Sequence, residues 1–209
     1  MSTQGRRQAA VVVVTGVLLG AVDLLAQRSL PYPWANLANS SAVWAVGAFA
    51  IGRYVHRLWW RSAVAGVALL LIAVESYELT AVAVQHDDWA NLWAPATLTW
   101  LAAGVLAGAV FGTGGAWSRE NDGWRRRLGA ARPVAVLLAE AGVDVYRSGQ
   151  GDAAYRTDSL WTAAITAVLG IALGWVLGGS ARGRLATFAI SVPLALLGFG
   201  AFRLAGFGG

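Results

Sequence analysis

Apolar residues form long, nearly unbroken stretches along this chain, separated by short polar segments. A helix needs about 20 mostly apolar residues to cross the hydrocarbon core of a membrane. The stretches that reach or approach this length predict seven transmembrane helices, at residues 9–26, 41–58, 62–84, 93–117, 133–147, 159–178 and 185–204. The fifth of these is the shortest, and Pro133 is expected at its first helical position, where proline is tolerated. We therefore expect an all-α fold, a seven-helix transmembrane bundle in which residues 1–209 form a single integral membrane domain.

Composition agrees with a membrane protein and narrows the possible chemistry. Only 13% of the 209 residues are charged, against about 25% in a typical soluble domain. The absence of cysteine excludes disulfides and thiolate metal sites. His56 and His86 are far apart and neither stands in a metal-ligand spacing. We therefore expect no bound metal and no cofactor.

The arginines predict how the helices are oriented. All 16 basic residues are arginine, and twelve of them fall on one side of the seven-helix topology. Because loops rich in positive charge remain in the cytoplasm, we expect a cytoplasmic N-terminus, an external C-terminus and a location in the cell membrane. The arginines then serve as topology signals, so we expect membrane lipid and no nucleic acid among the partners, despite the net charge of +5.

Four acidic residues stand out because they interrupt apolar helices. Glu75 and Glu78 share one side of the third predicted helix, and Glu140 and Asp144 share one side of the fifth. A charged side chain at the membrane centre costs roughly 2.5 kcal/mol or more, so such residues have a partner or a function. We expect the two helices to face each other across a polar-floored cavity. The structural alternatives are a hydrogen bond between the helices for Glu75 and Glu140, and access to water at the boundary for Glu78 and Asp144.

A buried carboxyl group beside aromatic rings suits one reaction in particular. Burial in an apolar site raises the pKa of a carboxyl group and keeps it protonated, and aromatic faces stabilise cations. We therefore predict a terpene cyclase that protonates a lipophilic prenyl (farnesyl-type) chain, with Glu75 or Glu140 as the acid and its partner carboxyl group tuning the pKa. Glu78 and Asp144 are further catalytic candidates. The residues expected to contact the substrate are Tyr77, Asn39, Trp44, Trp100 and Tyr146. The chain contains no Asp-rich DDxxD or DxDD motif, which disfavours a Mg²⁺-dependent enzyme that ionises a diphosphate.

Two resemblances accompany this interpretation. In its size, its seven spans and its membrane-embedded acids, the chain resembles the bacterial membrane-bound terpene cyclases of indole-terpenoid (drimentine-type) pathways, which implies metal-independent cyclisation of a prenylated small molecule. Segments over most of the chain also resemble an uncharacterised actinobacterial multi-pass membrane family, which implies no activity: ANSSAVW (38–44), AVESYELTA (73–81), FGTGGAWSR (111–119) and LLAEAGVDVY (137–146). Glu78 departs from the Gly-Tyr-Tyr-like sequence expected in that family after the first acid.

Two other functions remain open on the sequence. Intramembrane carboxylates also relay protons, so a small proton-coupled transporter is one alternative, although no inverted repeat is evident. A non-catalytic membrane scaffold, in which the acids only hold helices together, is the other. The two differ from a cyclase in what replacing Glu75 or Glu140 would do to turnover and to stability.

Overall fold

The computed structural model describes residues 3–55, 58–121 and 123–204, and within them every regular element is helical. The predicted all-α class is therefore confirmed. The described residues form eight α-helices and one 3₁₀ turn, in the order α1 (Thr3–Ser29), α2 (Trp34–Ala38), α3 (Ser41–Val55), α4 (Trp59–Gln85), η1 (Trp89–Trp93), α5 (Pro95–Trp117), α6 (Trp124–Ser148), α7 (Ala153–Gly178) and α8 (Ala181–Leu204).

Five of these helices are long and apolar enough to cross a membrane, counting only the described residues: α1, α4, α5, α7 and α8. Helix α3 is apolar but has 15 residues, which is about 22 Å of helix against a hydrocarbon core about 30 Å thick. Helix α6 has 25 residues but is less apolar, because its first turns carry arginines. The chain is therefore a membrane protein by length and composition.

The predicted start of α6 is wrong. The helix begins at Trp124 rather than at Pro133, so the arginine-rich residues 124–132, which precede the predicted helix, belong to its first turns. Pro133 lies inside the helix and its side chain is fully buried. A proline is tolerated inside a helix when neighbouring helices surround it, and α6 packs against α3, α5, α7 and α8.

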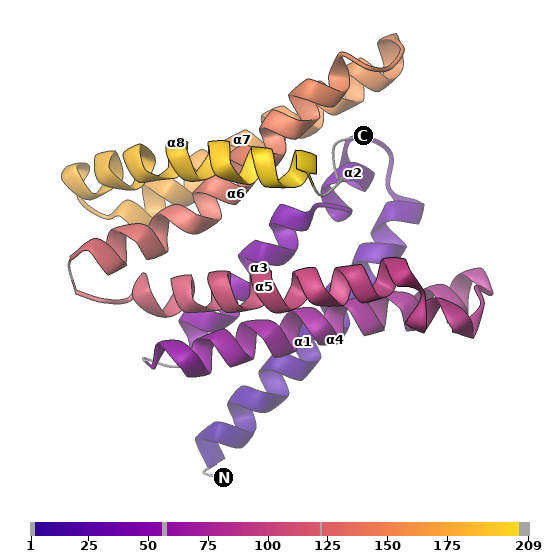
Figure 1. Ribbon diagram of the computed structural model, residues 1–209, viewed down its shortest axis with the longest axis horizontal. Helices are drawn as coiled ribbons and strands as arrows, with labels where there is room; N and C mark the ends of the chain where they lie inside the picture. Colours follow the sequence, from indigo (N-terminus) through magenta and orange to yellow (C-terminus); the bar gives the residue numbers. More distant parts are fainter. Residues whose placement is uncertain (1–2, 56–57, 122, 205–209) are drawn as a thin grey trace.

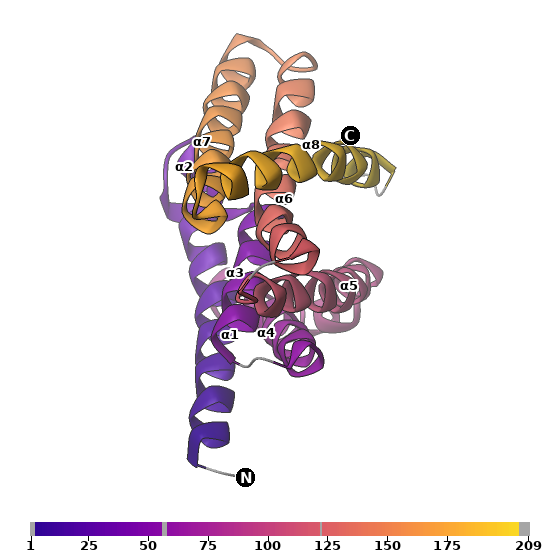
Figure 2. The same cartoon turned by 90° about the vertical axis from the view of Figure 1, so that its left-hand side faces the viewer.

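The helices form two groups joined through α3, α5 and α6 (Figures 1 and 2). In one group α4 packs against α1, α3 and α5; in the other α6 packs against α7 and α8. Helices α3 and α5 contact both α4 and α6, and Figure 1 shows α5 between them. This arrangement decides which of the acidic residues can meet.

Very close backbone contacts hold the first group together. Gly108 and Gly112 of α5 lie so near α4 that a Cβ atom at Gly108 would be 2.5 Å from the Val67 Cα atom, and one at Gly112 would be 2.3 Å from the Ser62 carbonyl oxygen. On the other side of α4, a Cβ atom at Gly20 of α1 would be 2.0 Å from the Ala73 carbonyl oxygen. Small residues allow helices in a membrane to approach this closely.

The arginine-rich segments gather at one end of the bundle. Figure 1 shows the α5–α6 and α7–α8 turns together at its left-hand end. The Arg53 guanidinium group at the end of α3 donates to the Ser118 hydroxyl group at 2.7 Å, and Arg119 donates to the Arg53 carbonyl oxygen at 2.7 Å. The Gln8 side chain donates to the Val55 carbonyl oxygen, so the start of α1 lies beside the end of α3. Arg57 is one of the twelve arginines on the predicted cytoplasmic side, and it lies outside the described residues.

Candidate functional site

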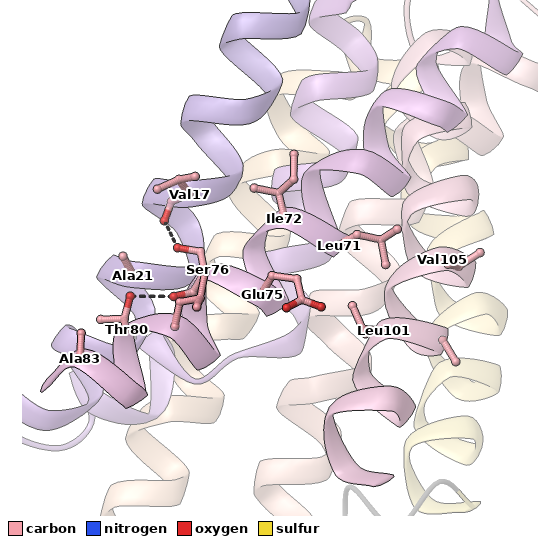
Figure 3. A pocket seen from close by; sticks show the side chains of 12 residues that line it. Val17, Ala21, Leu71, Ile72, Glu75, Ser76, Thr80, Ala83, Leu101 and Val105 are labelled. Carbon is pink, nitrogen blue, oxygen red and sulfur yellow. Dashed lines mark hydrogen bonds between the residues drawn. The ribbon is translucent and has the colours of Figure 1, made fainter. Parts of the chain in front are cut away.

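Glu75 lines an apolar pocket of about 830 Å³ between α1, α4 and α5 (Figure 3). The pocket wall includes Val17 of α1, Ile72 of α4, and Leu101 and Val105 of α5. The Glu75 side chain extends across the pocket towards Leu101 (Figure 3). Within the described part of the chain, its carboxylate accepts no hydrogen bond and pairs with no arginine. A carboxyl group is thus presented to an apolar space without a protein partner.

The α4 backbone and α1 hold this pocket in shape. The Ser76 hydroxyl group donates to the Val17 carbonyl oxygen of α1 at 2.8 Å, and the Thr80 hydroxyl group donates to the Ser76 carbonyl oxygen at 2.6 Å (Figure 3). These bonds satisfy the polar groups next to Glu75 and leave the Glu75 carboxylate as the polar feature of the pocket. The pocket opens at the surface of the bundle, where the Leu79 and Val105 side chains are exposed.

Glu78 contacts different residues from Glu75, although it is one turn away on the same helix. Its Oε1 atom is 3.2 Å from the buried Thr97 hydroxyl group, which also donates to the Asn91 carbonyl oxygen at 2.7 Å. Glu78 therefore ties α4 to the η1 turn and to the start of α5. It does not line the Glu75 pocket.

Glu140 caps the beginning of α3. Its carboxylate accepts hydrogen bonds from the Ser40 hydroxyl group, from the backbone N–H of Ala42 at 3.3 Å, and from the backbone N–H of Ser41. The first N–H groups of a helix have no partner within the helix and carry positive partial charge, so a carboxylate stabilises them. Asp144, one turn further along α6, lies 3.8 Å from the Arg147 guanidinium group.

The expectation that Glu75 and Glu140 meet in one chamber is wrong. Glu75 lies between α1, α4 and α5, whereas Glu140 points from α6 to the end of α3. The physical reason is the packing order, because α3 and α5 lie between α4 and α6. The alternative of a hydrogen bond between the two acid-bearing helices is also wrong, because Glu140 of α6 bonds to Ser40 and to the start of α3 rather than to α4.

A polar cluster that the sequence did not single out lies nearer the centre of the first group. Asp23 is buried, and its carboxylate accepts hydrogen bonds from the Gln27 side chain at 3.1 Å and from the Trp44 side chain. The Tyr77 hydroxyl group is 3.4 Å from the Gln27 amide oxygen. The nearby Arg28 guanidinium group donates to the Val84 carbonyl oxygen at 3.4 Å. The sequence signal that could have revealed this cluster is the spacing of Asp23 and Gln27, which lie one helical turn apart.

The residues predicted to contact a substrate are dispersed, and none of them lines the Glu75 pocket. Trp44 and Tyr77 lie edge to face, with ring centres 6.5 Å apart, in the Asp23 cluster. Tyr146 lies under the Arg203 guanidinium group at 3.8 Å. Trp100 is 40% exposed near the start of α5, and Asn39 is exposed at the end of α2. The structure thus brings Trp44 and Tyr77 together.

Comparison with known proteins places the chain in a family. Residues 2–206 match DUF6518, a family of unknown function. The chain belongs to this family. No curated protein and no solved structure matches this DUF6518 chain, so its function has to be argued from the side chains themselves.

The two carboxyl groups of this DUF6518 protein differ in what they can do. Glu140 has three protein donors and so stabilises the fold, whereas Glu75 has none and faces a space that an apolar molecule can fill. A carboxyl group in such a space can give a proton to a bound molecule and take one back. The pocket of Glu75 is therefore the candidate functional site.

We expect the Glu140→Ala variant to lose about 1–3 kcal/mol of stability, because two N–H groups and a hydroxyl group lose their acceptor. The measurement is the midpoint of thermal unfolding of the full chain in detergent, followed by gel filtration. Glu75→Ala is the matched control, since it removes a carboxyl group without hydrogen-bond partners and should shift the midpoint little. Equal midpoints for Glu140→Ala and the wild type would contradict the capping role.

Proposed function

We propose that this chain is a metal-independent, membrane-bound terpene cyclase that takes a lipophilic prenyl chain from the bilayer and starts its cyclisation with a proton from Glu75. The observation that carries the proposal is the unpartnered Glu75 carboxyl group in an apolar pocket of about 830 Å³. Ligand pockets generally have volumes of about 300–1,000 Å³ and an apolar lining with few polar groups. The opening beside Leu79 and Val105 would give the chain access from lipid.

The reaction needs no other reactant. The protonated Glu75 carboxyl group gives its proton to one carbon of an alkene, so a C–H bond forms and the O–H bond breaks. The cation on the other alkene carbon is attacked by the next double bond of the chain, which closes a ring. Loss of a neighbouring proton to the Glu75 carboxylate then forms the product alkene and restores the acid. The product is an isomer of the substrate.

The arrangement of arginines supports a seven-span topology with a cytoplasmic N-terminus and an external C-terminus in the cell membrane. The segments rich in arginine lie at one end of the bundle (Figure 1), as the preference of positive loops for the cytoplasm requires. In this topology α3 and α6 complete the set of crossing helices. Glu75 then lies in the outer half of the membrane.

A non-catalytic membrane scaffold is the second candidate, and the hydrogen bonds of Glu140 and Glu78 favour it. Both residues join helices in the way a structural residue would. Glu75 distinguishes the two functions, because its carboxylate joins nothing within the described residues. A scaffold gives no reason for an acid at this position.

The test of the proposal is turnover in deuterated water. Membranes that contain the full chain are incubated with a farnesyl-type polyene, and the expected product is a cyclic isomer with one deuterium at the protonated carbon. Ala102→Trp is the blocking variant, because Ala102 lines the pocket and is itself exposed, so an indole there fills the space while Glu75 remains. We expect kcat/KM to fall at least about tenfold, since binding of the chain is lost.

Two results would contradict this function. One is the absence of any deuterated cyclic product from a panel of prenyl alkenes and epoxides. The other is a product formed at the same rate by the wild type and the Ala102→Trp variant, which would mean that the reaction takes place outside the pocket.

A further inference from the structure

A second pocket, of about 290 Å³, lies at the arginine-rich end of the bundle, far along the chain from Glu75. It is formed by the α5–α6 turn, the first turns of α6, and the α7–α8 turn. Three arginines and three neutral polar residues contribute to its wall: Arg126, Arg127, Arg182, Asn121, Ser180 and Thr187. A polar pocket of this kind has no part in the chemistry proposed for Glu75.

The neighbouring arginines Arg125, Arg132 and Arg184 already have partners, and this distinguishes them from Arg126 and Arg182 of the pocket. Arg132 donates to the Val110 carbonyl oxygen at 2.6 Å, and Arg184 donates to the Trp175 carbonyl oxygen at 3.2 Å. Arg125 pairs with Glu120 at 3.9 Å. Within the described residues, by contrast, the guanidinium groups of Arg126 and Arg182 form no ion pair and donate no hydrogen bond.

The pocket arginines come from helices that are far apart in sequence. A Cβ atom at Gly179 would be 3.1 Å from the Arg126 Nη2 atom, so the half-buried Arg126 side chain reaches from α6 to the α7–α8 turn. Arg182 lies on the other side of that turn, in the first turn of α8. The fold thus places like charges around one small space, although their mutual repulsion opposes it.

An anion would relieve this repulsion. Among the described lining residues there is no carboxylate; Asp122 lies outside the described residues. Guanidinium groups bind phosphate oxygens with paired N–H donors. The pocket also lies at the start of α8, a 24-residue helix whose first N–H groups favour negative charge.

We propose that this pocket binds an anionic phosphate group, and that the group belongs to the headgroup of an anionic phospholipid. Basic pockets between membrane helices on the cytoplasmic side bind such headgroups. The helices beside the pocket supply the surface for the acyl chains, since Val176 of α7 is 74% exposed and Leu185 of α8 is 73% exposed. The phosphate group would hold α6, α7 and α8 together at their cytoplasmic ends.

The experiment is native mass spectrometry of the full chain, titrated with phosphatidylglycerol and with zwitterionic phosphatidylcholine. We expect the wild type to prefer phosphatidylglycerol and Arg126→Gln/Arg182→Gln to lose about 30-fold of that preference, because each arginine near a membrane surface contributes about a fivefold attraction. Arg6→Gln/Arg61→Gln is the matched control, with the same change in charge at the same end of the bundle but outside the pocket.

Inorganic phosphate distinguishes the two sources of the phosphate group. Displacement of phosphatidylglycerol only at molar phosphate would identify the lipid, whereas binding of millimolar phosphate to the lipid-free wild type, but not to the pocket variant, would identify a soluble phosphate. The proposal is overturned if the pocket variant keeps the wild-type preference, or loses no more of it than the control does. If the double variant does not fold, Arg182→Gln alone is tested, because that side chain is exposed; the expected loss is then about fivefold.

Discussion

Glu75→Gln is expected to lower turnover of a prenyl substrate by about 100- to 10,000-fold, the range in which a positioned general acid contributes to a reaction rate. Glutamine has the shape of glutamic acid, and its amide cannot give up a proton to an alkene. Because the Glu75 carboxylate has no hydrogen bond to lose within the described residues, the variant should fold like the wild type. The measurement is the rate of deuterated product, normalised to the folded chain in the membrane.

Glu78→Gln is the control on the same helix. Glu78 contacts Thr97 rather than the pocket, and a glutamine amide oxygen can still accept from that hydroxyl group. We therefore expect turnover within a few-fold of the wild type, so that a loss confined to Glu75→Gln identifies the acid. Equal rates for Glu75→Gln and the wild type would exclude Glu75 as the proton donor, and the scaffold function would then be preferred.

The helices themselves could be predicted from the sequence, because long apolar runs have few alternatives to helix in lipid. The residues at which the helices begin and end could be predicted less well. Helices α1, α6, α7 and α8 begin at Thr3, Trp124, Ala153 and Ala181 rather than at residues 9, 133, 159 and 185, and each of these starts includes arginine outside the apolar run. Hydropathy marks where a helix can enter hydrocarbon, and it does not mark where the helix stops.

The site could be predicted only in part. Glu75 was found because an acid in an apolar helix is costly, and the structure does give it a pocket. The prediction that Glu140 is its partner was wrong, since the position of an acid along a helix does not tell which helices are neighbours. Glu75 and Glu78 are one turn apart on α4, yet Glu75 lines a pocket that Leu101 and Val105 of α5 help to form, whereas Glu78 contacts Thr97 at the start of α5.

Glycines allow α5 to pack closely against α4, and replacing them is expected to lower stability. We expect Gly108→Ala and Gly112→Ala to cost about 1–3 kcal/mol each, as for other substitutions that overfill a packed interior. Each methyl group would have to lie about 2.3–2.5 Å from α4 backbone atoms, so the two helices would have to move apart. The measurement is the thermal unfolding midpoint of the full chain in detergent.

Gly104→Ala, one turn away on α5, is the control that separates packing from helix propensity. A Cβ atom there would be 3.5 Å from the Leu70 Cβ atom, which is an ordinary contact. Alanine also favours a helix over glycine by about 1 kcal/mol, so this variant should be as stable as the wild type or slightly more stable. If all three alanine variants unfold at the wild-type midpoint, α4 and α5 are not held at the distance seen here. Leu101 and Val105 could then no longer be taken to line the Glu75 pocket, because that pocket requires α5 to pack against α4.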